Sequence, residues 1–212
     1  MTLKLYGMAL STNTQRVTVV CHEKNIPFEL VKVDLFANEH KSAGFLEKQP
    51  FGQVPYIDDD GFVLYESRPI AAYIARKYAA QGTPGLVPSD PQDHALYEQA
   101  VATEMSHFDP SASGLSFEMI AKKIFFKTDP DEARVAQLLS TLNAKLDVYE
   151  EILGKQKYLA GDEITLADLF HLPAGTRLVK IGLDVIEKRP NVSRWWKDIS
   201  SRPSWVAVTS SA

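Results

Sequence analysis

A serine at the expected start of a helix is the residue in this sequence best placed for chemistry. Ser11 follows a short stretch, residues 3–6, that predicts a strand stopping at Gly7, and apolar residues then recur at helical spacing. Unpaired N–H groups and the helix dipole favour negative charge at such a position. A thiolate held there would be stabilised by the Ser11 hydroxyl as a donor, together with backbone N–H groups. The simpler interpretation, that Ser11 only caps the helix, stays open on these residues alone.

A predicted β-hairpin followed by a helix forms a second candidate for binding. Residues 54–57 and 62–65 favour strands, and the acidic run with glycine between them favours a turn. Pro55 is a candidate for a cis peptide bond, because X–Pro bonds alone populate the cis form readily. Such a bond would expose the backbone of Val54, and an exposed peptide edge can pair with another peptide. Ser67 is predicted to cap the helix that follows.

A small α/β unit is needed to position these residues. The segment between residues 6 and 28 is long enough for a helical crossover, which favours a parallel, right-handed strand-helix-strand unit. A weaker helix precedes the hairpin. The predicted elements are strands at 3–6 and 28–33, a helix at 42–48, the hairpin, and a helix from Ser67 to about Ala79, in the order βαβαββα.

The rest of the chain is predicted to be helical. Residues 81–90 are rich in Gly and Pro and predict a linker between an N-terminal domain, residues 1–80, and a helical domain, residues 91–212. A long helix begins near Asp90 and is expected to be irregular around Asp109-Pro110-Ser111. A later helix carries an apolar face formed by Val135, Leu139, Leu142, Leu146, Tyr149 and Leu153, and stops at Gly154.

Composition excludes several classes of function. The net charge is −4 and no basic run is longer than a pair, so neither nucleic acid nor an acidic membrane is an expected partner. The sequence predicts no signal peptide and no membrane span, which makes a cytoplasmic protein the expectation. Cys21 is the one cysteine, and the histidines at 94, 107 and 171 lack partners at ligand spacing, so no metal is expected.

Four motifs together resemble one family. Tyr6-Gly7-x-x-Leu10-Ser11-Thr12-x-x-x-Arg16-Val17 is similar to the catalytic loop of phi-class glutathione transferases, and Gln53-Val54-Pro55 with Glu66-Ser67-Arg68 is similar to their glutathione-binding edge. Residues 159–169 and 190–205 resemble segments of their helical domain. The resemblance implies a thioredoxin-like N-terminal domain, an all-α C-terminal domain, and a glutathione S-transferase. One departure is Met8-Ala9, where many members carry a proline before the serine.

The resemblance also implies the residues that bind glutathione as co-substrate. Ser11 is the expected catalytic residue, which holds the thiolate. Lys41 would receive the glycine carboxylate, Glu66 the α-amino group, and Ser67 the α-carboxylate of the γ-glutamyl end. The full expected set is Ser11, Thr12, His40, Lys41, Gln53, Val54, Pro55, Glu66 and Ser67.

The expected reaction is attack of the glutathione thiolate on a hydrophobic electrophile, with peroxidase activity on organic hydroperoxides as a further expectation. An alternative is a weakly catalytic or non-catalytic carrier of hydrophobic molecules, of the ligandin type. Members of the family are typically homodimers, so a homodimer is expected. The acceptor pocket is expected between the domains, lined by Met8, Leu10, Phe36, Phe117 and Ile120.

Two other residues, Tyr6 and Cys21, are alternatives to Ser11 as the catalytic residue. Tyr6 lies about where other transferase classes carry a catalytic tyrosine. Cys21 lies deep in the first helix among valines, where a core position is expected.

Thr165 and Asp168 are spaced as a helix capping box, so Asp168 is expected to be buried and charged, and to serve folding rather than catalysis.

Overall fold

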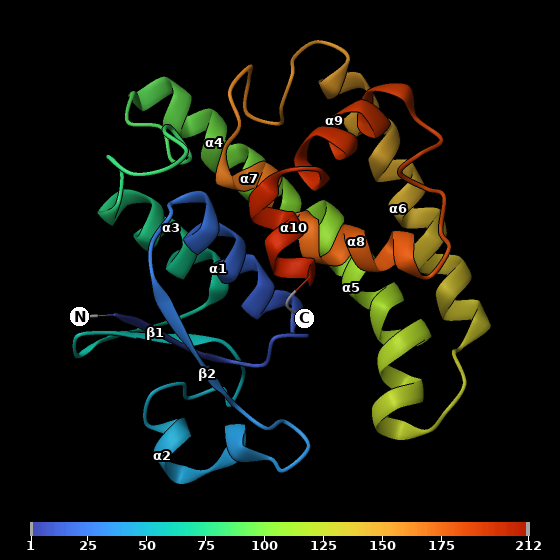
Figure 1. The fold of residues 1–212 in the computed structure, drawn as a ribbon. Helices are drawn as coiled ribbons and strands as arrows, with labels where there is room; N and C mark the ends of the chain where they lie inside the picture. Colours follow the sequence, from blue (N-terminus) through green and yellow to red (C-terminus); the bar gives the residue numbers. More distant parts are fainter. Residues whose placement is uncertain (1, 211–212) are drawn as a thin grey trace. The chain divides into compact units, whose positions relative to one another are not determined.

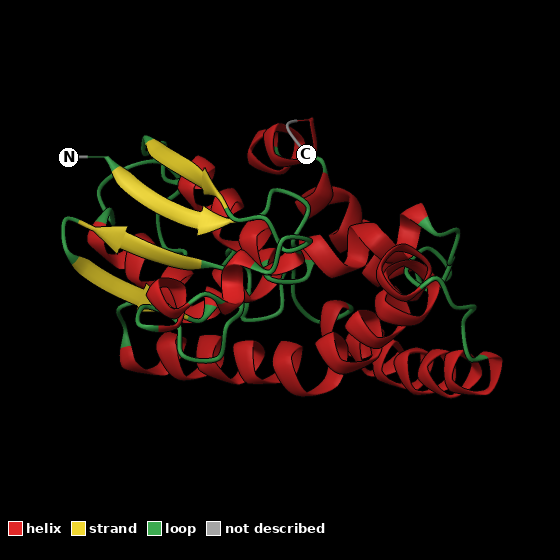
Figure 2. Ribbon diagram, turned by 90° about the horizontal axis from the view of Figure 1, so that it is seen from below, coloured by secondary structure: helices red, strands yellow, loops and turns green. Residues whose placement is uncertain are grey.

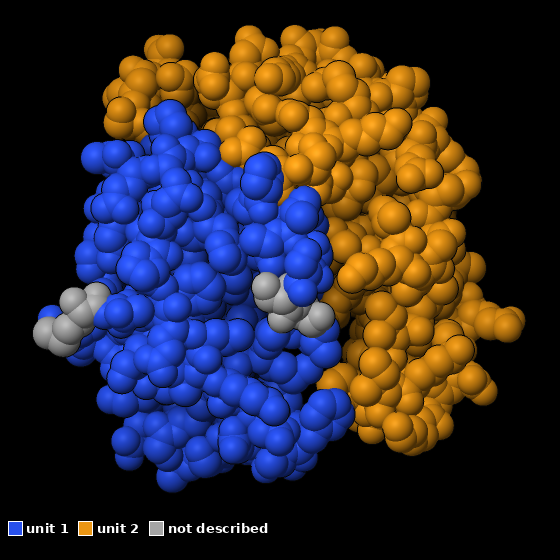
Figure 3. Space-filling model, in the orientation of Figure 1, with its two compact units in different colours: residues 1–87, 203–212 blue, residues 88–202 orange. Residues whose placement is uncertain are grey.

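The computed structural model describes residues 2–210, whose contacts divide the chain into two compact units (Figure 3). The first unit joins the chain up to Val87 to the C-terminal helix, and the second spans Pro88–Arg202. The expected boundaries differ at the C-terminus, because the segment after residue 202, expected in the helical domain, packs on the first helix of the chain.

The first unit contains a four-stranded mixed sheet in the order β2-β1-β3-β4 (Figures 1 and 2). Its first two strands are parallel and its last two form an antiparallel hairpin, which confirms the predicted parallel crossover and the predicted turn. Leu5 lies opposite Ile57 where the central strands pair. The strands are β1 (Leu3–Gly7), β2 (Phe28–Lys32), β3 (Tyr56–Asp59) and β4 (Phe62–Tyr65).

Helices cover both faces of this sheet. On one face, α1 (Thr12–Glu23) packs against α3 (Ser67–Lys77), and on the other lies the short α2 (Ala43–Leu46) (Figure 1). Successive side chains of a strand point to opposite faces, so Leu5 is buried on one side and Tyr6 packs on the other. Tyr6 joins a cluster built around Val33, Phe45, Val54 and Tyr56.

The end of α1 is tied to two distant parts of the same unit. The Glu23 carboxylate accepts hydrogen bonds from the hydroxyls of Thr83 and of Ser204, the latter in α10 (Pro203–Ser210). The buried Lys24 ammonium donates to the carbonyl oxygen of Thr83 over 2.7 Å. These contacts explain why the C-terminal helix belongs to the first unit.

The second unit is helical, as predicted, and two π-helical stretches interrupt its first long helix. The irregularity expected at residues 109–111 lies just before them, where Glu104–Phe108 is π-helical. Pro110 has no N–H to continue the ladder, so it occupies the start of a new helical segment. A second π-helical stretch is Phe117–Phe126. The α-helices are α4 (Pro91–Thr103), α5 (Asp109–Ser116), α6 (Glu132–Leu153), α7 (Leu166–Leu169), α8 (Leu172–Lys180) and α9 (Pro190–Ser200).

The buried face of α6 differs from the predicted one at its first turns. Leu138 is buried, whereas Val135 and Leu139 are only half-buried. A straight α-helix has 3.6 residues per turn, so a strict alternation of four- and three-residue steps drifts across its surface. The four later predicted positions, Leu142, Leu146, Tyr149 and Leu153, are all buried, and the helix ends before Gly154 as predicted.

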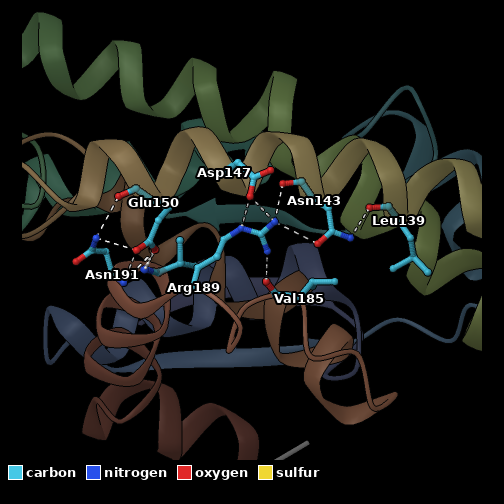
Figure 4. Close-up of polar contacts among 8 residues, drawn as sticks. Leu139, Asn143, Asp147, Glu150, Val185, Arg189 and Asn191 are labelled. Atoms are coloured by element: carbon cyan, nitrogen blue, oxygen red, sulfur yellow. Dashed lines mark hydrogen bonds and ion pairs between the residues drawn. The ribbon is translucent and has the colours of Figure 1, made fainter.

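Side chains of α6 hold the start of α9 (Figure 4). The Glu150 carboxylate accepts from the backbone N–H groups of Asn191 and Val192, each over 3.0 Å. The preceding Arg189 donates to Asp147 over 2.6 Å. A carboxylate from a neighbouring helix thus supplies the cap that the sequence around residue 190 lacks.

Asp168 is fully buried, as predicted, at the start of α7. Its carboxylate accepts from the backbone N–H of Thr165 over 3.0 Å, which completes the predicted capping box, and from the N–H of Leu159 over 3.0 Å. The indole of Trp195 donates to the same carboxylate. The predicted core positions of the tryptophans are confirmed, because Trp195, Trp196 and Trp205 are all buried.

Candidate functional site

Ser11 occupies the N-cap position of α1. Its backbone is extended, with φ −70° and ψ 127°, and its N–H donates to the carbonyl oxygen of Met8 over 2.8 Å. This hydrogen bond closes a tight turn through Met8 and Ala9, and the turn places Ser11 at the start of α1. The Ser11 hydroxyl accepts from the N–H of Thr14 over 3.4 Å, a long bond that leaves its proton able to serve another acceptor. Thr12 is the first residue of the helix.

The cis bond predicted at the Val54 edge is present in the structure, between Val54 and Pro55. Val54 is buried, and Gln53 before it is exposed. The N–H of Gln53 donates to the side-chain oxygen of Gln49 over 3.2 Å, so a buried glutamine fixes the approach to this edge.

His40 and Lys41 lie in a short 3₁₀ turn, Glu39–Lys41, that adjoins the same loop. The Lys41 ammonium donates to the carbonyl oxygen of Gly52 over 2.8 Å, which holds the loop in place. Gly52 has φ +59°, and a Cβ there would lie 2.9 Å from the carbonyl oxygen of His40, so a residue with a side chain would be strained at this position. Burial and the charge of Lys41 lower the pKa of His40, and its buried Nδ1 has no hydrogen-bond partner within residues 2–210.

The capping role expected of Ser67 is wrong, because Glu66 holds that position. Ser67 is the first residue of α3, and Glu66 holds the N-cap position with φ +70°, a left-handed backbone that is uncommon for a residue with a side chain. Ser67 is not the cap because it is already helical, and its hydroxyl instead accepts from the guanidinium of Arg16 over 2.9 Å. Glu66 is exposed and Ser67 is buried.

The strand register brings these segments to one end of the sheet. Tyr6 lies opposite Tyr56, and Tyr56 opposite Tyr65. The loop to Ser11 therefore leaves β1 at the end where β3 begins after Pro55 and where β4 leads into Glu66 and α3. The parallel β2 also ends there, because its last residue pairs with Gly7. The starts of two helices and the Val54–Pro55 peptide thus converge at the carboxyl end of β1.

This arrangement suits an anionic, peptide-like ligand. The N-termini of α1 and α3 supply unpaired N–H groups and the positive ends of two helix dipoles. In the first turn of α1, which is fully described, no acidic residue opposes an incoming anion. A thiolate at one helix start and a carboxylate at the other are the groups these ends can stabilise.

The residues expected to line the acceptor pocket belong to two different units. In the first unit Leu10 and Phe36 are exposed and Met8 is half-buried. In the second, Phe117 is exposed and Ile120 is half-buried. Large apolar side chains exposed in this way suit contact with an apolar molecule, and their joint lining of one pocket stays a prediction.

Neither competitor of Ser11 has surroundings that suit catalysis. The ring of Tyr6 stacks on that of Tyr56, with centroids 4.4 Å apart and planes 9° from parallel, so the side chain has a packing role. The Cys21 thiol is fully buried, as predicted for a core position. Burial raises the pKa of Cys21 to about 12, which keeps the thiol protonated and inert.

Sequence reasoning missed the roles of two buried polar residues. Arg16 is 1% exposed and reaches Ser67, which is 51 positions away in the chain. Gln49 is 2% exposed and holds Gln53. Long polar side chains are rarely buried without a partner, but the sequence gives no signal of which residue that partner is.

Metal binding and membrane insertion are two other properties on which the described residues bear. No cluster of three or more His, Cys, Asp or Glu side chains within residues 2–210 could hold a metal ion. Over the same range, none of the helices combines the length and the apolar character needed to cross a membrane.

The sequence matches two family models and many known proteins. Residues 5–83 match the glutathione S-transferase N-terminal domain, and residues 110–203 match the C-terminal domain. The chain is 44% identical over 210 residues to glutathione S-transferase F13 of Arabidopsis thaliana, covering 99% of this chain and 95% of the relative.

Solved structures agree with these sequence matches. The crystal structure of glutathione transferase F7 from Populus trichocarpa superposes with a TM-score of 0.94 at 41% identity, covering 98% of both chains. Glutathione S-transferase I from maize, in complex with an atrazine glutathione conjugate, gives a TM-score of 0.92 at 32% identity, covering 99% of this chain and 97% of the other.

Proposed function

Because this chain belongs to the glutathione S-transferase family, with plant phi-class relatives, we propose that it binds glutathione at the carboxyl end of β1 and activates its thiol beside Ser11. The chain is a glutathione transferase, with glutathione as co-substrate. The observation that supports this location most strongly is the convergence of Ser11, the Val54–Pro55 edge and the start of α3 at one end of the sheet.

Glutathione is an extended tripeptide whose charged groups match the polar groups of this site. The exposed backbone of Val54 pairs with its cysteinyl residue as an added strand edge. Lys41 and Gln53, with the neutral ring of His40, receive the glycine carboxylate. Glu66 accepts from the α-amino group, and Ser67 with the N–H groups at the start of α3 takes the α-carboxylate. Thr12 adds the first helical N–H beside the sulfur.

The chemical step depends on keeping the sulfur ionised. A free thiol has a pKa of about 8.5, so it is mostly protonated at neutral pH, and each unit of downward shift corresponds to about 1.4 kcal/mol in favour of the thiolate. The Ser11 hydroxyl donates to the sulfur and the start of α1 adds favourable electrostatics. The thiol proton passes to solvent, the sulfur forms a bond to the electrophilic atom, and the leaving group departs with the electrons of its former bond.

Organic hydroperoxides are a second proposed class of substrate. The thiolate attacks one peroxide oxygen, the O–O bond breaks, and the alkoxide takes a proton to leave as an alcohol. The resulting glutathione sulfenic acid reacts with a second glutathione to give glutathione disulfide and water. The reaction therefore consumes two thiols per peroxide, with glutathione itself as the reductant.

The acceptor, the assembly and the compartment complete the proposal. The hydrophobic acceptor is proposed to contact five apolar residues: Met8, Leu10, Phe36, Phe117 and Ile120.

A homodimer is also proposed. It is supported by exposed apolar side chains of the first unit such as Phe51, and light scattering after gel filtration tests it. The cytoplasm is the proposed location, since the reaction needs reduced glutathione.

One set of rates tests the function and the role of Ser11 together. Initial rates of conjugation with 1-chloro-2,4-dinitrobenzene, and of cumene hydroperoxide reduction, are measured with glutathione for the wild type, Ser11→Ala and Tyr6→Phe. We expect Ser11→Ala to lower kcat/KM roughly 10- to 1,000-fold, as for loss of an oxyanion donor, and Tyr6→Phe to have less effect. The pH at which the bound thiol ionises should rise in Ser11→Ala.

Other results have distinct meanings. Unchanged rates in Ser11→Ala would exclude the serine as thiolate donor. A large loss in Tyr6→Phe alone would assign the role to the tyrosine. Inactivity of the wild type combined with tight binding of apolar dyes would support a carrier of the ligandin type, which the exposed Leu10 and Phe36 also suit.

A further inference from the structure

A buried arginine lies directly behind one of the proposed glutathione contacts. The Nη1 atom of Arg16 donates to the Ser67 hydroxyl oxygen over 2.9 Å. Arg16 is 1% exposed and Ser67 is 5% exposed, so this charge-assisted hydrogen bond is shielded from water. Neither residue is the N-cap of the helix in which it lies, because Ser11 caps α1 and Glu66 holds that position in α3.

The direction of this bond determines what the Ser67 hydroxyl can still do. A serine hydroxyl has two acceptor lone pairs and one donor proton. Arg16 has no acceptor, so it can occupy only a lone pair of the Ser67 oxygen and leaves the proton free to point elsewhere. Within residues 2–210 no acceptor receives that proton. Ser67 is therefore set as a hydrogen-bond donor.

Arg16 is itself oriented from within its own helix. The same Nη1 atom donates to the side-chain oxygen of Asn13, one turn earlier in α1. Both hydrogens of that nitrogen are thus engaged, one by α1 and one by α3. Because Asn13 follows Ser11 by two positions, the pair Asn13–Arg16 links the helix start that holds the proposed thiolate to the helix start that holds the γ-glutamyl end.

We propose that Arg16 is a positioning residue that directs the Ser67 hydroxyl as a donor to the α-carboxylate of the γ-glutamyl group. The inference rests on the proposed function, because it concerns how that same site reads one end of glutathione. Arg16 acts through Ser67 and also places a buried positive charge behind the carboxylate, where water screens it little. We therefore expect the site to bind a ligand with a carboxylate at this position more tightly than one with a neutral group there.

A pair of ligands separates this role from a structural one. Dissociation constants are measured by calorimetry for glutathione and for glutathione whose γ-glutamyl α-carboxylate is converted to a carboxamide. The proteins are the wild type, Arg16→Gln, Arg16→Lys, Ser67→Ala and the double variant Arg16→Gln/Ser67→Ala. Losing one charge-assisted contact should weaken glutathione binding about tenfold or more in Arg16→Gln, with a loss of less than about threefold for the carboxamide.

Two further results are expected if Arg16 acts through Ser67. The double variant should bind glutathione little more weakly than Ser67→Ala alone, because residues that act as a unit are not additive. Arg16→Lys keeps the charge but loses the planar fork, so it should recover part of the binding. Equal losses for the two ligands, or fully additive losses in the double variant, would overturn the proposal.

Controls address the chance that a buried arginine is needed for folding. Val20→Ala removes buried packing from the same helix without touching Ser67, so it should lower stability and leave the ratio of the two dissociation constants unchanged. Asn13→Ala alters an exposed residue and keeps Arg16 in place, so it should shift that ratio in the same direction as Arg16→Gln, but less. An unchanged ratio in Asn13→Ala would contradict the linkage through Asn13.

The two proposals fail in different ways. Absence of glutathione binding by the wild type would contradict the proposed function. Normal wild-type binding, with the same ratio of dissociation constants in wild type and Arg16→Gln, would leave the function standing and remove the role assigned to Arg16.

Discussion

The indole N–H of Trp195 donates to a carboxylate oxygen of Asp168 over 2.9 Å, and both side chains are buried. The same carboxylate accepts from the backbone of Leu159 and from the backbone and hydroxyl of Thr165. Burial raises the pKa of Asp168, while these donors stabilise its ionised form. One side chain thus joins α9, the start of α7 and the loop before it.

Replacing Asp168 should destabilise the second unit strongly. Asp168→Ala would leave four buried donors without their acceptor, at a cost of about 3–5 kcal/mol in the free energy of unfolding, and Asp168→Asn, which keeps one oxygen, should cost about half as much. Urea unfolding followed by tryptophan fluorescence measures both. Asp162→Asn, at an exposed position of the same loop, is the control and should lie within about 1 kcal/mol of the wild type. A similarly small change in Asp168→Ala would show that the carboxylate is dispensable.

The Glu150 carboxylate, which caps α9 from α6, should also contribute to stability. Glu150→Gln keeps the shape but replaces one carboxylate oxygen by an amide nitrogen, which cannot accept, so the N–H groups of Asn191 and Val192 lose part of their cap. We expect a loss of about 1–2 kcal/mol, typical of an N-cap, in urea unfolding. The neighbouring Glu151→Gln, at an exposed position, is the matched control. Equal stabilities of the two variants would argue against a capping role.

The Cys21 thiol should not react in the folded protein. With its pKa raised to about 12 by burial, about one molecule in 10⁴ carries a thiolate at pH 8, compared with roughly a quarter for an ordinary cysteine. Labelling with an aromatic disulfide reagent should therefore be at least about a thousandfold slower for native protein than in 8 M urea, where one thiol per chain should titrate. Rapid labelling of native protein would contradict the buried position.

Acid should remove the contribution that Asp59 makes to the free energy of unfolding. Burial raises the pKa of its carboxyl, but hydrogen bonds from Lys77 and Tyr73 outweigh this effect and hold the pKa below its ordinary value. A lowered folded-state pKa gives stability that is present above the unfolded pKa of about 3.9 and is lost as pH falls through the folded value. Lys77 is 40% exposed, so the effect at pH 7 should stay below about 1 kcal/mol.

The measurement compares Asp59→Asn with the wild type in urea at several pH values between 7 and 3. The difference in stability should be largest near pH 7 and should shrink below about pH 4. Asp60→Asn, at an exposed position in the same turn, should show no comparable trend. A difference that stays constant across this range would mean that the ion pair contributes nothing measurable.

Local patterns allowed much of the first unit to be predicted. Strand alternation around Leu5, the turn at Gly61 and the cis bond at Pro55 each depend on a few neighbouring residues, and each is found in the structure. The capping box at Asp168 has the same local character. Such features follow from φ/ψ preferences and hydrogen bonds within one or two turns of chain.

Contacts between distant residues could not be predicted in the same way. The Ser67 hydroxyl accepts a hydrogen bond from Arg16 in another helix, and no spacing rule connects the two residues. Leu138 of α6 is buried although the predicted alternation does not include it, and Gly114 of α5, which lies against it, is distant in the sequence. The position of α10 beside α1 likewise depends on the folded unit rather than on its own sequence.

The placement of α10 in the first unit has a consequence for how the chain is made. The N-terminus of a chain emerges from the ribosome first, and N-terminal domains generally fold before the rest of the chain is synthesised. Here the helix that carries Ser204, the partner of Glu23, follows the second unit in the chain, so the α/β unit cannot reach its final form until the second unit has been synthesised. A nascent chain that stalls after the second unit would carry a sheet domain that still lacks the helix packed on α1.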